Sequence, residues 1–139
     1  MTGIVKGRGA FSFLRRNPTQ TELNDQLIAA AGKCDIIAIK KALEDGAEIN
    51  ANDGSSQMTA LHHAASKGHT AAIQTLLEAG AKVDVQTDYK MTPLYYAADN
   101  GHTAAIQKLL EAGAAIDTLS KWEDTPLRIA AFHGHVGWW

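Results

Sequence analysis

Residues 59–83 recur almost unchanged at residues 92–116. Of the 25 aligned positions, 17 are identical, at a fixed offset of 33 residues. A period of this length is typical of stacked structural repeats, in which each unit buries its apolar face against its neighbours. This repetition constrains the fold more strongly than any single short motif in the chain.

Each copy predicts two short helices joined by a glycine turn. A threonine stands where the first helix would begin, and its hydroxyl can accept a hydrogen bond from a free backbone N–H group. The second helix would begin at Thr70 or Thr103 and carry an apolar stripe that only a neighbouring unit can bury. The stripe consists of Ile73, Leu76 and Leu77 in one copy and Ile106, Leu109 and Leu110 in the next, and Leu77 and Leu110 are expected to be buried between repeats. The shared positions are Thr59, Thr92 and Thr125 before the first helix, Pro93 and Pro126 at its start, and Gly68, Gly101 and Gly134 after it.

An earlier copy precedes these at an offset of 34 residues. It matches Leu27 with Leu61, Ala30-Ala31 with Ala64-Ala65, and Gly46-Ala47 with Gly80-Ala81. The extra residue falls in the loop 53–58, which a surface turn accommodates readily. Thr19 and Glu22 have capping-box spacing, so order is expected from residue 19, and Gly32 is expected to close the helix that follows.

A fourth copy begins at Thr125 and reaches His135, where four residues follow in place of a second helix. We therefore expect a flexible basic leader at residues 1–18 and one domain at residues 19–139. The expected repeats are about 19–52, 53–86, 87–119 and a truncated 120–139. Trp138 and Trp139 are expected to fold back as a cap, or else to leave an exposed end through which the chain self-associates.

The stretch Thr92-Pro-Leu-Tyr-Tyr-Ala-Ala98, with Gly101-His102 and Leu109-Leu-Glu-Ala-Gly-Ala114, resembles the ankyrin repeat family. The resemblance covers residues 23–135. It implies an all-α solenoid of stacked helix-turn-helix units with projecting β-turns or hairpins, in three full repeats and a truncated fourth. It also implies a concave face that binds other proteins, and it does not imply catalysis.

Two departures from the family pattern bear on this particular chain. Gln57, Lys90 and Glu123 stand where the projecting turns of the family usually carry glycine, so a left-handed backbone there would cost about 1 kcal/mol each. His63 and Tyr96 replace the apolar residue that usually follows Leu-His, which places a polar group near the core.

Composition excludes several other classes of protein. Net charge is −2, with no run of 18 apolar residues, so neither nucleic acid nor a membrane is the expected partner. Cys34 is the one cysteine, which favours an intracellular, cytoplasmic location, and it is expected to be structural although Lys33 lies beside it. The leader carries four basic residues and no acid, which leaves organelle targeting or an anionic-surface tether open as alternatives.

The six histidines raise the question of a zinc site, because His62, His63 and His69 are close in sequence. The family resemblance instead assigns His62, His69, His102 and His135 to structural hydrogen bonds. No Cys-x-x-Cys or His-Glu-x-x-His pattern completes a ligand set, and repeated acids such as Glu78 and Glu111 indicate solvated faces. The sequence therefore predicts no catalytic, cofactor-binding or metal-binding residue and no enzyme activity.

A non-enzymatic module that binds another protein, without a small-molecule substrate, is the predicted function. The alternative is a piece of a larger enzyme or receptor that serves as its docking or regulatory part. Positions that differ between copies, at the turn tips and along the first helices, are expected to contact the partner. They are Ser56, Met58, Ser66, Lys67, Asp88, Tyr89, Met91, Asp99, Asn100, Lys121, Trp122, Asp124, Phe132 and His133. Tyr89 and Trp122 are 33 residues apart, so they are expected to be neighbours on successive turn tips.

Overall fold

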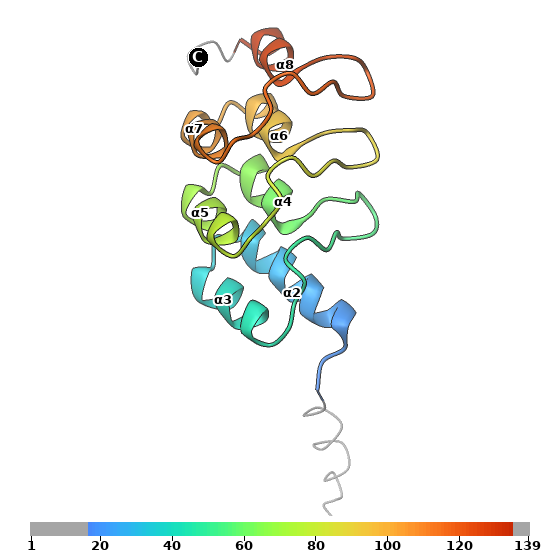
Figure 1. Ribbon diagram of the computed structural model, residues 1–139, viewed down its shortest axis with the longest axis vertical. Helices are drawn as coiled ribbons and strands as arrows, with labels where there is room; N and C mark the ends of the chain where they lie inside the picture. Colours follow the sequence, from blue (N-terminus) through green and yellow to red (C-terminus); the bar gives the residue numbers. More distant parts are fainter. Residues whose placement is uncertain (1–16, 135–139) are drawn as a thin grey trace, which may run out of the picture.

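The computed structural model describes residues 17–134, which form seven α-helices and no β-strand. Three antiparallel helix pairs are followed by one further helix, stacked along a single axis (Figure 1). The elements are α2 (Gln20–Gly32) and α3 (Ile36–Glu44), α4 (Ala60–Ser66) and α5 (Thr70–Glu78), α6 (Pro93–Asp99) and α7 (Thr103–Glu111), and α8 (Pro126–Phe132). The predicted all-α repeat architecture is confirmed.

The first helix of each repeat begins directly after the threonine that was predicted to cap it. Thr59, Thr92 and Thr125 each accept a hydrogen bond from the backbone N–H three residues later. Thr19 and Glu22 form the reciprocal capping box that opens α2. These bonds satisfy backbone donors that a helix leaves free at its first turn, so they favour a defined start even for helices of only seven to nine residues.

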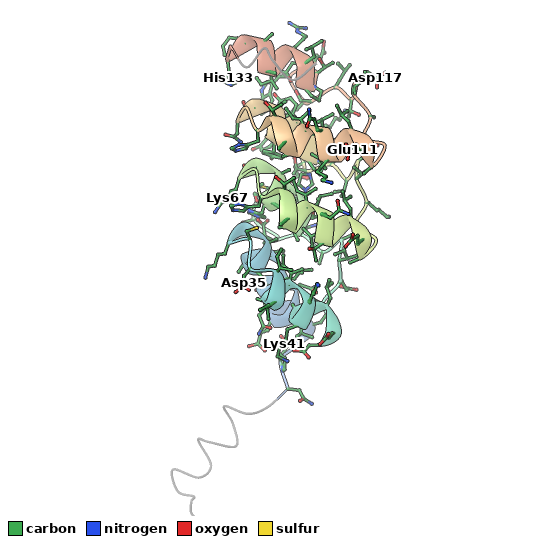
Figure 2. All side chains as sticks on the ribbon, turned by 90° about the vertical axis from the view of Figure 1, so that its left-hand side faces the viewer. Asp35, Lys41, Lys67, Glu111, Asp117 and His133 are labelled. Carbon is green, nitrogen blue, oxygen red and sulfur yellow. The ribbon has the colours of Figure 1, made fainter. Side chains whose placement is uncertain are left out.

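Two helical layers enclose the core. The first helices of the pairs lie between the second helices on one side and the projecting turns on the other (Figure 1). Figure 2 looks onto the layer of second helices, with Lys67 and His133 along one edge of the stack and Asp117 along the other. The largest fully buried side chains come from both layers and include Leu61, Ile73, Leu76, Leu94, Ile106 and Leu109.

Left-handed residues end the first helices. Gly68, Gly101 and Gly134 have φ angles of 72°, 73° and 77°. In the first repeat, the expected closing residue Gly32 is the last residue of α2, and Cys34 takes the left-handed position with φ 55°. The helix therefore closes at Gly32 as expected, and Cys34 is the residue that aligns with the glycines of the other repeats.

Hydrogen bonds between repeats fix the stacking distance. His69 Nε2 donates to the backbone oxygen of Gly32 at 3.1 Å, which joins the second repeat to the first. Asn50 Oδ1 accepts from Lys82 N at 2.9 Å, and Asp84 Oδ1 accepts from Ala115 N at 3.0 Å, one repeat further along. The loops that contain Lys82 and Ala115 are therefore each held by a side chain of the preceding loop.

Part of the sequence-based picture lies outside the described residues. This applies to most of the basic leader, to His135, and to the cap expected from Trp138 and Trp139. Within residues 17–134, none of the helices combines the length and apolar character that crossing a membrane requires.

The periodic stripe placed the wrong leucine at the centre of the core. Leu77 and Leu110 were expected to be buried between repeats, but they are only partly buried, whereas the preceding Leu76 and Leu109 have no exposed surface. Adjacent leucines point about 100° apart on a helix, and the pattern Ile-x-x-Leu-Leu fits either choice.

We predict that Leu76→Ala or Leu109→Ala lowers the free energy of unfolding by about 2–5 kcal/mol, because each leaves a cavity between repeats. The loss for Leu77→Ala should be smaller, and Glu78→Ala should change stability by less than about 0.5 kcal/mol. Urea unfolding followed by circular dichroism measures all of these. A larger loss for Leu77→Ala than for Leu76→Ala would contradict this helical register.

A second prediction concerns Gly68, whose position has no room for a side chain. A Cβ added there would lie 2.6 Å from the ring of His102 in the next repeat, besides adopting a left-handed φ. Gly80→Ala is the control, because it carries the same kind of backbone strain, of roughly 1–2 kcal/mol, with nothing within 4 Å. Gly68→Ala should therefore lower the melting temperature more than Gly80→Ala, and equal melting of the two variants would exclude the close contact.

Candidate functional site

The three projecting turns share one construction. The backbone N–H of Asp53, Thr87 or Ser120 donates to the carbonyl of Met58, Met91 or Asp124 across the turn, at 2.9–3.0 Å. The side-chain oxygen of the same first residue accepts a backbone N–H from the tip, as in Asx and Ser/Thr turns. The left-handed residue near the end of each turn is Gln57, Lys90 or Glu123, with φ of 58°, 59° and 64°, so the three turns adopt this geometry without glycine.

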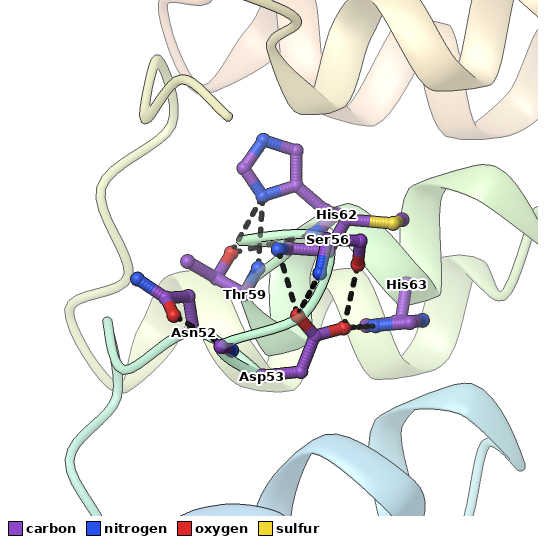
Figure 3. A network of polar contacts seen from close by, with 8 residues as sticks. Asn52, Asp53, Ser56, Thr59, His62 and His63 are labelled. Carbon is purple, nitrogen blue, oxygen red and sulfur yellow. Dashed lines mark hydrogen bonds and ion pairs between the residues drawn. The ribbon is translucent and has the colours of Figure 1, made fainter. Parts of the chain in front are cut away.

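Asp53 organises the turn before α4 (Figure 3). Its carboxylate accepts from the Ser56 hydroxyl at 2.7 Å, from the Ser56 and Met58 backbone N–H groups at 3.0 and 3.3 Å, and lies 3.1 Å from His63 Nε2. Burial raises the pKa of Asp53, but these hydrogen bonds together outweigh burial and lower its pKa to about 2. The carboxylate therefore stays ionised and holds the turn at neutral pH.

His62 connects this turn to the next repeat. Its Nδ1 accepts from the backbone N–H of Thr59 at 3.0 Å, and its Nε2 lies 3.0 Å from the carbonyl oxygen of Met91. These partners require a neutral ring with the proton on Nε2. Burial lowers the pKa of His62 to about 4, and the hydrogen bond to Met91 opposes that change only in part.

Tyr95 takes the place of this histidine in the third repeat. It is buried, and burial together with hydrogen bonding to the Asp124 carboxylate raises the pKa of Tyr95 to about 12. Asp124 also accepts a hydrogen bond from the Ser120 hydroxyl. The same position of two repeats therefore reaches the following turn, through a histidine in one case and through a tyrosine in the other.

Tyr89 and Trp122 stack on each other at the tips of successive turns. Their ring centroids are 5.3 Å apart with an interplanar angle of 22°, which confirms the prediction that they are neighbours. Lys121 supports the pair twice, because its backbone N–H donates to the Tyr89 carbonyl at 2.7 Å and its Nζ lies 5.1 Å from the Tyr89 ring centroid. Tyr89 nevertheless remains 45% exposed and Trp122 59% exposed.

Polar side chains also pair between repeats at the ends of the first helices. Asn100 Nδ2 donates to Ser66 Oγ at 3.2 Å, and His133 Nε2 lies 2.8 Å from Asp99 Oδ1. Phe132 is 81% exposed at the end of α8. We call the surface formed by residues 66, 67, 99, 100, 132 and 133 the interhelix edge.

A family model described as ankyrin repeats, in three copies, matches residues 27–120 and 82–137. The chain belongs to the ankyrin repeat family. Ankyrin repeats are generally protein–protein interaction modules. A search of curated proteins finds no significant match to the chain. Among residues 17–134 of this ankyrin domain, no group of three or more His, Cys, Asp or Glu side chains is arranged to hold a metal ion.

The ankyrin stack divides the predicted partner-binding residues into two groups. The exposed ones, at the turn tips and on the interhelix edge, are Ser56, Lys67, Asp88, Tyr89, Asn100, Lys121, Trp122, Phe132 and His133. The half-buried ones are Met58, Ser66, Met91, Asp99 and Asp124. Met58, Met91 and Asp124 also close the turns through their backbone, so their primary contacts are within the ankyrin domain.

Sequence reasoning did not find Asp53 and Ser120, which organise two of the turns. The signal was present, because Asp53, Thr87 and Ser120 are all small polar acceptors placed directly before a turn. The extra residue of the first turn obscured the equivalence of Asp53 and Thr87, because a fixed offset of 33 aligns Gly54 rather than Asp53 with Thr87.

The third prediction follows from the neutral state of His62. Its folded pKa of about 4 lies below the ordinary 6.5, so the unfolded chain binds a proton more readily. Its contribution to stability is complete above pH 6.5 and is lost as the pH falls toward 4, by roughly 3 kcal/mol in total. Asp53 should add a second loss between pH 3.8 and about 2.

Urea unfolding between about pH 7 and 4.5 measures this dependence. The control is His62→Tyr, which copies the residue that the third repeat uses at this position. The difference in unfolding free energy between the natural chain and His62→Tyr should decrease as the pH falls. A difference that is constant with pH would mean that His62 is not the titrating group.

Proposed function

We propose that this ankyrin domain is a non-enzymatic interaction module that binds one partner protein across its turn tips and the concave side of its first helices. The proposed surface joins the tips at Asp88, Tyr89, Lys121 and Trp122 with the interhelix edge. Both parts belong to positions that vary between repeats, so their side chains can change while the stack is kept.

The stacked pair of Tyr89 and Trp122 carries this proposal. Two aromatic rings that remain about half exposed at adjacent tips are unfavourable in water, and Trp and Tyr are over-represented among the residues that dominate binding energy. The ring stack and the backbone bond from Lys121 to Tyr89 also hold both side chains in place. Binding would therefore require little further loss of side-chain entropy.

A purely structural role for the pair is the competing explanation. Stacked rings would then stiffen the tips, and their removal would lower stability. The two explanations differ in what a double substitution changes, because the tips lie outside the buried core formed by the helices. A recognition role predicts lost binding with little change in melting, and a structural role predicts the reverse.

The fourth prediction tests this with Tyr89→Ala/Trp122→Ala. Partners captured from a cell lysate by the immobilised natural chain are identified by mass spectrometry, and the leading one is purified for calorimetry. The double variant should bind it at least about 30-fold more weakly, equivalent to about 2 kcal/mol, with nearly unchanged melting.

Ile37→Ala is the matched control, because Ile37 is 82% exposed on α3 and lies outside the proposed surface. It should leave affinity unchanged. Retained affinity in the double variant would remove the aromatic pair from the binding site. Equal weakening by Ile37→Ala would show that the partner recognises exposed apolar residues in general.

A further inference from the structure

The outer face of the first repeat contains a groove that its own helices leave open. It has a volume of about 370 Å³ and runs between α2 and α3. Alanines form its floor, namely Ala29, Ala30, Ala38 and Ala42, and Lys33, Asp35, Lys41 and Asp45 lie at its margins. Small side chains in the floor make a groove that larger apolar side chains could fill.

The later repeats show what normally covers these positions. The residues that correspond to Gln26, Ala30 and Ala38 in the second repeat are Ala60, Ala64 and Ala72, and each of them has no exposed surface. In the first repeat Gln26 is exposed and Ala38 is half-buried. The groove is therefore the surface on which a preceding repeat would pack, and in this chain residues 1–18 precede it.

The first described residues, Asn17 and Pro18, lie beside this groove. Asn17 and Pro18 line a hollow together with Leu23 and Asp45, and Asp45 is also part of the groove. Gln20 Nε2 donates to the carbonyl of Gly46 at 3.0 Å, which holds the start of α2 against the end of α3. Asn17, the first described residue, is thereby held next to one end of the groove, which we call the tethered end.

The sequence before Asn17 matches the groove in chemistry and in order. It reads Phe11-Ser-Phe-Leu-Arg-Arg16, with the two arginines nearest the tether. The chain around the tethered end carries more acids than bases. Glu22, Glu44, Asp45 and Glu48 belong to the start of α2, the end of α3 and the loop after it, against Lys40 and Lys41. Of these acids Asp45 lines the groove, where it pairs with Lys41 at 3.1 Å. With increasing distance from the tethered end, the apolar residues Leu14, Phe13 and Phe11 follow the arginines in the leader, and the alanine floor follows Asp45 in the groove.

The lengths also agree. From Asp45 to Asp35 the groove follows ten residues of helix, about 15 Å at 1.5 Å per residue. An extended segment covers that distance with about five residues at roughly 3.3 Å each. Residues 11–16 are sufficient to reach from the tether to Asp35.

We propose that residues 11–16 of the leader dock in the groove between α2 and α3 of the same molecule. Arg15 and Arg16 lie at the acidic end beside Asp45, Phe13 and Leu14 cover the alanine floor, and Phe11 reaches the end near Asp35. The leader then closes the first repeat as a cap, in the manner that terminal repeats of solenoids require.

Paramagnetic relaxation enhancement in the full chain tests this contact. A nitroxide is attached to Ile37→Cys, close to the Asp35 end of the groove, in a Cys34→Gly background that leaves a single thiol. Glycine suits residue 34, whose φ is 55°. Docking predicts strong loss of the amide signals of the leader, greatest at Phe11 and decreasing toward Arg16. A label at Ala104→Cys on the distant α7 should leave these signals intact.

Leader variants separate docking from chance proximity. Phe13→Asp/Leu14→Asp should abolish the loss of signal and lower the melting temperature, whereas the matched pair Ile4→Asp/Val5→Asp in the same leader should change neither. Equal signal loss from the labels at residues 37 and 104, or none from either, would overturn the proposal. So would retention of the signal loss in the Phe13→Asp/Leu14→Asp variant.

A mixed sample identifies the occupant of the groove. Isotope-labelled chain without nitroxide is combined with nitroxide-labelled chain without isotope, so that only contacts between molecules are detected. Intramolecular docking predicts no loss of the leader signals in this mixture. Loss comparable to that in the doubly labelled molecule would show that the leader docks on a second copy and would overturn the intramolecular assignment.

Discussion

Burial of small apolar side chains between neighbouring repeats is the interaction on which the whole structure depends. Ala64 and Ala97 have no exposed surface, and their size lets successive first helices approach closely. No helix pair could bury these faces alone, because two short helices enclose too little apolar area. Stacking therefore creates the core, and the residues that stack must be kept from copy to copy while the turn tips need not be.

Polar bonds between repeats add geometric precision to this packing. His62 and Tyr95 occupy the same position, and each reaches the turn of the following repeat from a buried site. A buried polar group without a partner costs about 1–3 kcal/mol, so these side chains favour the one stacking distance at which their partners are in reach. The stack is held at that distance by bonds that exist only when adjacent repeats are in register.

The sequence was sufficient to predict the helices, their caps and the stacking, because those features repeat at a fixed period. It did not distinguish Leu76 from Leu77, since a stripe of apolar residues defines a face without defining its centre. Asp53 also escaped prediction, because its role depends on where one inserted loop residue is accommodated. That Tyr89 and Trp122 lie on neighbouring turn tips followed from the period alone, while the choice of binding residues remains a prediction.

The position of the aromatic pair has a consequence for the proposed binding surface. Tyr89 and Trp122 belong to different repeats, and the hydrogen bond from Lys121 N to Tyr89 O also crosses that boundary. A partner that contacts both rings would bind only the form in which these two repeats are stacked, and so would stabilise it by mass action. Because each repeat contacts only its neighbours, this stabilisation would act first on the boundary before α8, where α8 lacks a paired second helix within residues 17–134. If the partner binds as proposed, binding at the tips and order at that end of the domain would therefore be thermodynamically coupled.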